Sequence, residues 1–182
     1  MKPARIFLLC GSSGSGKTTT LLRLLEMLES LSLDCRGVLC PPGFTNDEKT
    51  YIEIMDVASG DTRRLAEINH DQTQTLATAW WKLEPNAVGW GNQILQRSTP
   101  CDILILDEIG PLEFNREEGL VEGFKAVESR EYQLALVTMR PSLLEKALHR
   151  WPDAKVIQID RENQMAVISQ LYNEAVAATR NQ

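Results

Sequence analysis

The chain has 182 residues, 43% of them hydrophobic, which suffices for one sizeable core and favours a single α/β domain over residues 1–182. Its formal charge of −6 supplies no basic stripe for a nucleic-acid backbone, so no nucleic-acid partner is indicated. Because no apolar run approaches the roughly 18 residues of a membrane span and no signal-peptide pattern is present, we expect a cytoplasmic protein.

The first predicted strand, Ile6 to Cys10, is an unbroken apolar run of the kind that is buried on both faces of a parallel sheet. The segment that follows fits the phosphate-binding pattern G-x-x-x-x-G-K-[ST] and opens a helix, which is the context that the pattern requires. An ordinary Gly/Ser-rich turn has no need of a Lys-Thr pair at this offset. The expected nucleotide-binding residues are Gly11, Ser12, Ser13, Gly14, Ser15, Gly16, Lys17, Thr18 and Thr19.

Each part of this loop has an expected task. Successive backbone N–H groups and the helix N-terminus would bind phosphate oxygens. Lys17 would reach the β- and γ-phosphates, and the Thr18 hydroxyl would ligate the Mg²⁺ that accompanies a triphosphate.

The next segments predict a helix, a strand and an inserted hairpin. Leucines recur at helical spacing through residues 19–31, and Cys35 to Cys40 is typical of a second strand. Pro41-Pro42-Gly43 is expected to break regular pairing. Residues 49–68 alternate, turn at Ser59-Gly60-Asp61 and run back, which predicts an antiparallel β-hairpin. A solvated face is favoured for this hairpin, which carries Arg63 and Arg64, over a place near the nucleotide or a partner.

A tryptophan-rich segment comes after a predicted loop at residues 69–78. Trp80, Trp81 and Trp90 favour packing over stacking on a nucleotide base. Glu84-Pro85-Asn86 has the form of a helix start, which predicts a helix over residues 87–97.

A second chemical motif ends the strand predicted at residues 102–106. Four consecutive aliphatic residues lead into Asp107-Glu108. In phosphate-loop enzymes an aspartate at the end of a neighbouring strand holds Mg²⁺, so Asp107 takes that role. A glutamate directly after it is the candidate base for an attacking water, which makes Glu108 and Lys17 the expected catalytic residues. Alone, two acids after a strand also fit a solvated loop.

The remaining chain predicts a turn at residues 109–113, helices at 117–127, 141–150 and 163–178, and strands at 134–138 and 156–159. Thr138 and Arg140 lie at a strand end where phosphate-loop proteins often sense the γ-phosphate, although strand-end and loop roles are favoured for both. The four cysteines lie in or beside apolar runs without a C-x-x-C pair, which indicates reduced core thiols.

Several of these segments together resemble one family, the P-loop nucleoside-triphosphatases first described from thermophiles. The resemblance rests on the loop 11–18, Gly43-Phe44-Thr45, the hairpin, and above all Asp107-Glu108-Ile109-Gly110-Pro111-Leu112-Glu113. It implies a RecA-like three-layer α/β sandwich, Mg²⁺, and hydrolysis of triphosphates with little base preference. The chain departs from the family at Asn46 to Lys49, and at Asp160-Arg161-Glu162, where Arg161 stands for a family arginine.

The leading functional hypothesis is a Mg²⁺-dependent hydrolase that converts ATP, GTP, CTP or UTP to the diphosphate and phosphate. A small-molecule or nucleotide kinase on the same scaffold is the alternative, and a nucleotide-switched binding module is less favoured because no guanine-reading Asn-Lys-x-Asp segment is present. We expect a monomer. An arginine finger from Arg140, Arg161 or a neighbouring subunit stays open.

Overall fold

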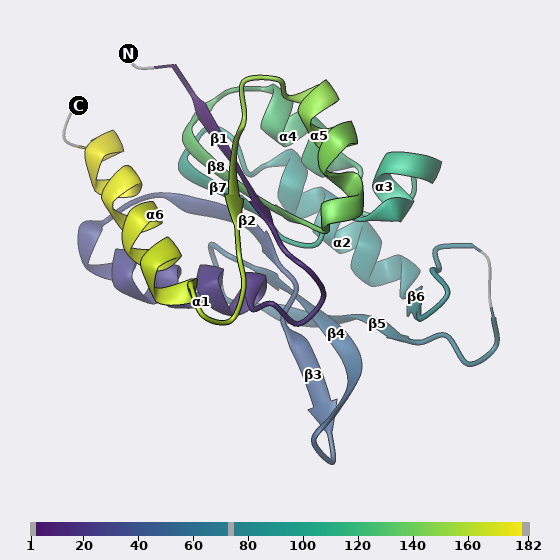
Figure 1. The fold of residues 1–182 in the computed structure, drawn as a ribbon. Coiled ribbons are helices and arrows are strands. Elements are labelled where there is room, and N and C mark those ends of the chain that lie inside the picture. Colours follow the sequence, from purple (N-terminus) through teal and green to yellow (C-terminus); the bar gives the residue numbers. More distant parts are fainter. Residues whose placement is uncertain (1–2, 73–74, 180–182) are drawn as a thin grey trace.

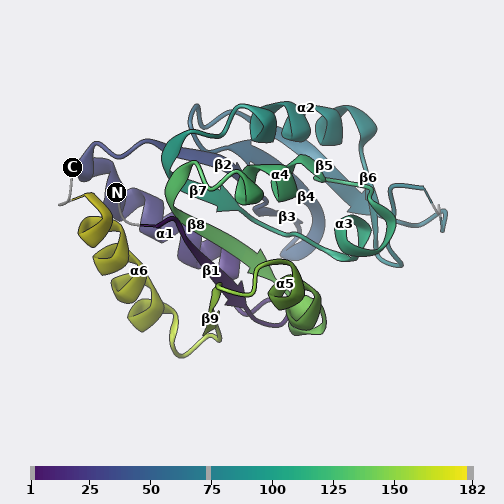
Figure 2. The same cartoon turned by 90° about the horizontal axis from the view of Figure 1, so that it is seen from above.

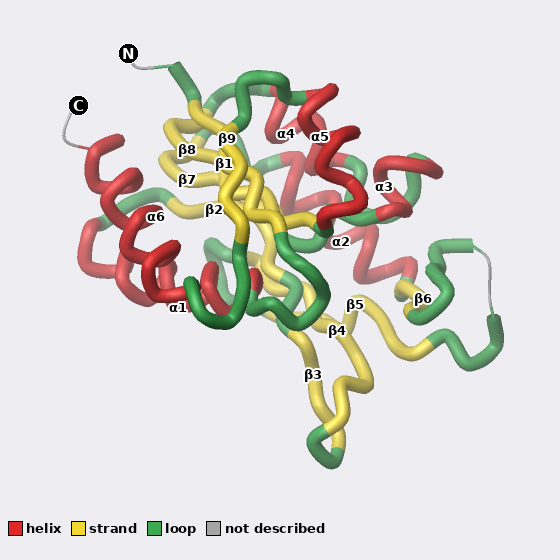
Figure 3. The backbone as a smooth tube through the Cα atoms, viewed as in Figure 1, coloured by secondary structure: helices red, strands yellow, loops and turns green. Residues whose placement is uncertain are grey.

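A computed structural model describes residues 3–72 and 75–179 as a sheet covered by helices on both faces (Figures 1 and 2). The sheet has nine strands, in the order β6-β5-β4-β2-β7-β8-β1-β9, with β3 paired to β4 (Figure 3). Five strands pair in parallel: β1 (Arg5–Cys10), β2 (Cys35–Leu39), β7 (Cys101–Leu106), β8 (Tyr132–Met139) and β9 (Lys155–Gln158). The antiparallel part contains β3 (Pro42–Thr45), β4 (Glu48–Asp56), β5 (Thr62–Ile68) and β6 (Trp81–Leu83).

The helices form two outer layers. One face carries α1 (Lys17–Leu28) and α6 (Gln164–Thr179), and the other carries α2 (Pro85–Gln96), α4 (Glu122–Glu128) and α5 (Leu144–Arg150), while α3 (Pro111–Arg116) lies at an end of the sheet (Figures 1 and 2). Short 3₁₀ turns cover Glu29–Leu31 and Pro141–Leu143. This arrangement confirms the expected α/β sandwich.

Strand β1 explains why both faces are covered. Ile6 and Leu8 belong to the core beneath α2 and α4, whereas Phe7 and Leu9 belong to the core beneath α1 and α6. Successive side chains of a strand point to opposite faces, so an unbroken apolar run needs a helical layer on each side. The order of the strands then decides which residues meet at their carboxyl ends. Because β8 lies between β1 and β7, Thr138 of β8 lies between the loop after β1 and the acids after β7.

The structure contradicts the predictions for residues 41–43 and for residues 109–127, where a turn at 109–113 and a helix at 117–127 were expected but α3 already begins at Pro111. Pro41-Pro42-Gly43 was expected to break pairing, yet β3 begins at Pro42 and pairs with β4; proline is tolerated because it occupies the first position of an edge strand. The helix expected over residues 117–127 begins only at Glu122, and a separate helix, α3, precedes it. Glu117 ends α3 in the left-handed region, with φ of 55°, so the two helices cannot be continuous.

The antiparallel hairpin predicted over residues 49–68 is present as β4 and β5, and it extends the parallel sheet. β4 pairs with β2, β3 and β5. The turn between β3 and β4 projects away from the body of the molecule (Figure 1). Strand β3, which leads into this turn, carries the exposed Phe44. Within the described chain, no helix is long and apolar enough to cross a membrane.

Gly37 is required where β2 meets β7. Its φ is 118°, and a Cβ there would lie 1.9 Å from the backbone oxygen of Ile105. We expect Gly37→Ala to lower the free energy of unfolding by about 3 kcal/mol or more, because both the backbone angle and the contact are unfavourable. Urea unfolding followed by circular dichroism measures this change.

Gly89 supplies the matched control for this prediction. It is exposed in α2, and a Cβ there meets nothing within 4 Å. Gly89→Ala should therefore stabilise the protein by about 0.5–1 kcal/mol. Equal effects of the two substitutions would contradict the assignment of a special backbone site at Gly37.

Candidate active site

The loop between β1 and α1 wraps around a lysine amino group. Helix α1 begins at Lys17 because Gly16, with φ of 94°, turns the chain into the helix. Lys17 is 5% exposed, and its Nζ donates to the backbone oxygens of Gly11 at 2.8 Å and Ser12 at 3.0 Å. The cation is thus held over the loop, at the carboxyl end of β1, where ligands of parallel sheets bind.

Two carboxylates follow β7. Asp107 is fully buried, and its Oδ2 accepts a hydrogen bond from the backbone N–H of Cys40 at 3.0 Å. Its Oδ1 accepts from the Thr138 hydroxyl, and the same hydroxyl oxygen accepts from the backbone N–H of Glu108 at 2.9 Å. Glu108 has φ of 61°, a left-handed conformation that is uncommon for a residue other than glycine. The side chain of Glu108 is therefore carried by a strained backbone, and the Thr138 hydroxyl holds that backbone through its N–H group.

Electrostatic interactions link the loop to the acids. Burial lowers the pKa of Lys17, and the charges of Glu108 and Asp107 oppose that shift. Burial, reinforced by the neighbouring charge of Asp107, raises the pKa of Glu108, whereas the cations Lys17, Arg140 and Lys49 lower it. Glu108 is thus a half-buried carboxylate among cations, as a general base requires.

The available oxygen ligands fit Mg²⁺. Thr18 in the first turn of α1 and Asp107 offer one hydroxyl and one carboxylate, both hard donors. Over residues 3–72 and 75–179 there is no group of three or more His, Cys, Asp or Glu side chains that could hold a metal. Mg²⁺ suits this sparse set, because it is commonly held by one or two protein oxygens together with substrate phosphates and water.

Thr138 was considered as a γ-phosphate sensor, but its hydroxyl is fully buried and bridges Asp107 and Glu108. We expect Thr138→Val to lower kcat about 10–100-fold with little change in KM, because it leaves the Glu108 N–H and an Asp107 oxygen without their partner. Thr138→Ser, which keeps the hydroxyl, should restore most of the rate. Steady-state kinetics measure both, and wild-type turnover by Thr138→Val would contradict the positioning role.

Two residues of the last strand–helix connection contact the phosphate loop. Arg161 Nε donates to the Gly14 oxygen at 3.3 Å, and Gln164 Nε2 donates to the Ser15 oxygen at 3.1 Å. The predicted arginine therefore lies at the loop, whereas Gln164 was missed by sequence reasoning. Gln164 is the first residue of α6, and nothing in its local pattern indicates a contact 149 residues away.

Glu113 braces the segment that follows Glu108. Its Oε2 accepts from the backbone N–H of Gly110, and its Oε1 accepts from that of Leu120, both at 2.8 Å. Burial raises its pKa, and these backbone hydrogen bonds oppose the shift. Glu113 therefore belongs to the Asp107-to-Glu113 motif because it supports the loop that follows Glu108, the candidate base.

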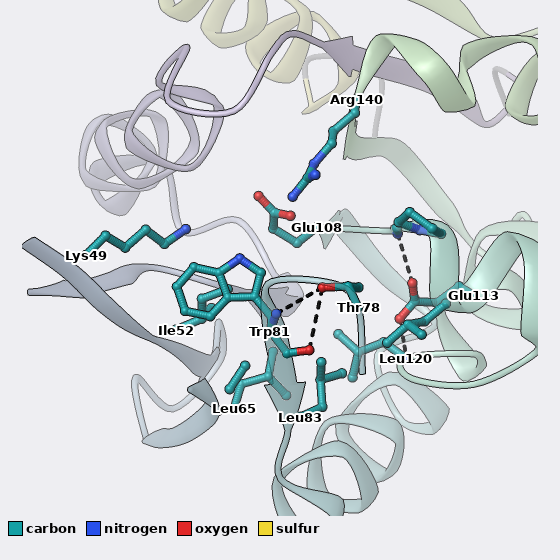
Figure 4. A pocket seen from close by; sticks show the side chains of 14 residues that line it. Lys49, Ile52, Leu65, Thr78, Trp81, Leu83, Glu108, Glu113, Leu120 and Arg140 are labelled. Atoms are coloured by element: carbon teal, nitrogen blue, oxygen red, sulfur yellow. Dashed lines mark hydrogen bonds between the residues drawn. The ribbon is translucent and has the colours of Figure 1, made fainter. Parts of the chain in front are cut away.

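The three tryptophans have separate environments. Trp80 is 73% exposed, and Trp81 lines a cavity beside Glu108. The ring of Trp90 lies under Arg63, whose Cζ is 4.5 Å from the ring centroid. Arg64 stacks on Tyr51 at 4.1 Å. Both hairpin arginines therefore cover aromatic rings, Arg63 the ring of Trp90 in α2 and Arg64 the ring of Tyr51 in β4. Arg140, by contrast, points toward Glu108 (Figure 4).

Comparisons with known proteins identify the family. A family model described as NTPase matches residues 6–172. The nucleoside-triphosphatase THEP1 of Thermofilum pendens is 27% identical over 175 residues, covering 94% of this chain and 95% of that protein. The enzyme of the same name from Sulfolobus acidocaldarius is 32% identical over 116 residues, covering 63% and 64%.

Solved structures show the same fold. A human cancer-related nucleoside triphosphatase superposes with a TM-score of 0.70 at 17% identity, covering 98% of this chain and 99% of that one. THEP1 from Aquifex aeolicus superposes with a TM-score of 0.63 at 19% identity, covering 91% and 96%.

Proposed function

Because this chain belongs to the NTPase family, we propose that it hydrolyses nucleoside triphosphates to the diphosphate and inorganic phosphate in a Mg²⁺-dependent reaction. The observation that carries the proposal is the group formed by Lys17, Asp107 and Glu108 at the carboxyl ends of β1 and β7, two parallel strands that are separated by β8. The charges of these three side chains act on one another. The carboxylate of Glu108 is carried by a strained backbone whose N–H donates a hydrogen bond to Thr138.

Each residue has one task in this reaction. The backbone N–H groups of the loop and Lys17 bind the phosphate oxygens and stabilise the negative charge that shifts onto them during transfer. Thr18 and Asp107 would hold Mg²⁺, which neutralises phosphate charge when bound. Glu108 accepts a proton from the water that attacks the γ-phosphorus, and Thr138 keeps Glu108 in the required orientation.

The proposal includes broad use of ATP, GTP, CTP and UTP by a monomer. No Asn-Lys-x-Asp or Thr-Lys-x-Asp segment for reading guanine occurs in the sequence. The residues that we assign to the reaction would all act at the phosphate end of the substrate, directly or, for Thr138, through Glu108, and every nucleoside triphosphate shares that end.

Phosphate release with each of the four triphosphates tests the proposal. With Mg²⁺ we expect release from all four at rates within about tenfold of one another, because a site that binds phosphates alone discriminates weakly among bases. Excess EDTA should abolish release. Strong preference for one base, or EDTA-resistant release, would contradict the broad Mg²⁺-dependent reaction.

A further inference from the structure

A cavity of about 70 Å³ lies beside the carboxylate of Glu108 (Figure 4). In the described part of the chain, none of the residues 11–18 of the phosphate loop lines it. Its wall is mostly apolar and comes from the antiparallel strands, α3 and the segment between α3 and α4, notably Ile52, Leu65, Trp81, Leu83, Leu112 and Leu120. The cavity therefore shares Glu108 with the catalytic group but is separate from the phosphate-binding loop.

Charged side chains of both signs line this cavity, and Glu113 is one of them. Lys49 and Arg140 line it together with Glu108, and Figure 4 shows the guanidinium of Arg140 directed at the Glu108 carboxylate. Lys49 Nζ lies 4.9 Å from the centroid of the Trp81 ring. The Thr78 hydroxyl accepts a hydrogen bond from the backbone N–H of Trp81 at 3.0 Å, which fixes the strand that carries this ring. The site thus combines an apolar body with two carboxylates and two cations, of which Arg140 lies nearest to the candidate base in Figure 4.

Water is a poor occupant for the apolar part. A buried water typically needs two to four polar partners, and an apolar cavity leaves it without them. An apolar cavity that stays dry can instead bind a small apolar group. At about half of the roughly 150 Å³ that accommodates benzene, the volume suits a branched aliphatic group of a few carbons.

We propose that this cavity is an acceptor site, where a small alcohol with a branched aliphatic body replaces water as the nucleophile. The inference rests on the proposed function, because Glu108 serves both reactions. The alcohol O–H proton passes to the Glu108 carboxylate while the alcohol oxygen forms a bond to the γ-phosphorus. The bond from that phosphorus to the β,γ-bridging oxygen breaks, and the products are a phosphate monoester and the nucleoside diphosphate. Lys49 and Arg140 lie where they offset the charge of the ester.

The ratio of two products tests this inference. The protein is incubated with Mg²⁺, ATP and 3-methyl-1-butanol, and ³¹P NMR quantifies phosphate monoester and inorganic phosphate in the same sample. Glycerol at the same concentration is the polar comparison. We expect an ester-to-phosphate ratio at least about tenfold higher with 3-methyl-1-butanol, because an apolar cavity discriminates by the methylene groups that it buries.

Filling the cavity should lower this ratio. Ala66 and Leu83 line it, so Ala66→Leu and Leu83→Phe are expected to reduce the ratio at least about tenfold. Ala58→Leu adds a similar volume at an exposed position beside a different cavity and should leave the ratio unchanged. Because both products come from the same active molecules, the ratio does not depend on how much of a variant is folded.

The outcomes separate this inference from the proposed function. Phosphate without any ester, or an ester-to-phosphate ratio that Ala66→Leu and Leu83→Phe leave unchanged, would overturn the acceptor site while hydrolysis stands. Failure to release phosphate in the absence of alcohol would instead contradict the hydrolase. Loss of both products in Glu108→Gln supports a base common to the two reactions.

Discussion

Replacing Glu108 by Gln is expected to lower kcat by about 10²–10⁴-fold while triphosphate binding stays close to that of the wild type. Gln keeps the size of the side chain and the backbone hydrogen bond to Thr138, but it cannot accept the proton of the attacking water. The loss should therefore appear in turnover and not in affinity. Phosphate-release kinetics and titration calorimetry on the same preparation measure the two quantities.

Glu117→Gln is the matched control for this substitution. Glu117 has φ of 55°, close to the 61° of Glu108, but its side chain is exposed at the end of α3. The control makes the same chemical change at the same kind of backbone position and should leave turnover unchanged. A Glu108→Gln protein as active as this control would remove Glu108 from the mechanism.

Replacing Lys17 by Ala is expected to weaken triphosphate binding and to lower kcat by about 10²–10³-fold. The buried ammonium group faces Asp107 and Glu108 and is the only side-chain cation of the loop itself. Its removal leaves the γ-phosphate without a direct charge-assisted donor. Calorimetry with a non-hydrolysable ATP analogue measures the loss of affinity.

Lys125→Ala controls for the removal of a lysine elsewhere. Lys125 is exposed in α4 and pairs with Glu122, three residues earlier on the same helix. Exposed pairs of this kind contribute little to stability, so binding and turnover should match the wild type. Equal affinities of Lys17→Ala and Lys125→Ala would contradict the assignment of the phosphate loop.

The local parts of the fold and site were predictable from the sequence. The run from Ile6 through Thr18 combines an apolar strand with a phosphate-binding pattern, and the structure places β1 and α1 on either side of the loop. The family and the α/β fold were likewise confirmed. These features depend on short-range spacing, which a single sequence records directly.

The parts that failed depend on contacts between distant segments. The bridge from Asp107 through Thr138 joins residues 31 positions apart and exists because β8 lies between β1 and β7. Glu113 bonds to Leu120 across the stretch that was expected to be helical, and this contact accompanies the separation of α3 from α4. Sheet order and such long-range hydrogen bonds leave no periodic signal in the sequence.

The cavity beside Glu108 was missed for the same reason. Trp81 was expected to pack in the interior, but it belongs to β6 at the far end of the antiparallel strands and borders the candidate base. Only the pairing of β6 with β5, and of β5 with β4, brings this end of the sheet to Glu108.

Hydrolysis of ATP in water enriched with ¹⁸O tests the central claim most directly. The proposed reaction attacks the γ-phosphorus with water, so mass spectrometry should find one heavy oxygen in the inorganic phosphate and none in the ADP. The label should enter with Mg²⁺ and the wild-type protein, and only at a residual rate with Glu108→Gln. Label in the ADP, or equal labelling by the two proteins, would contradict the account.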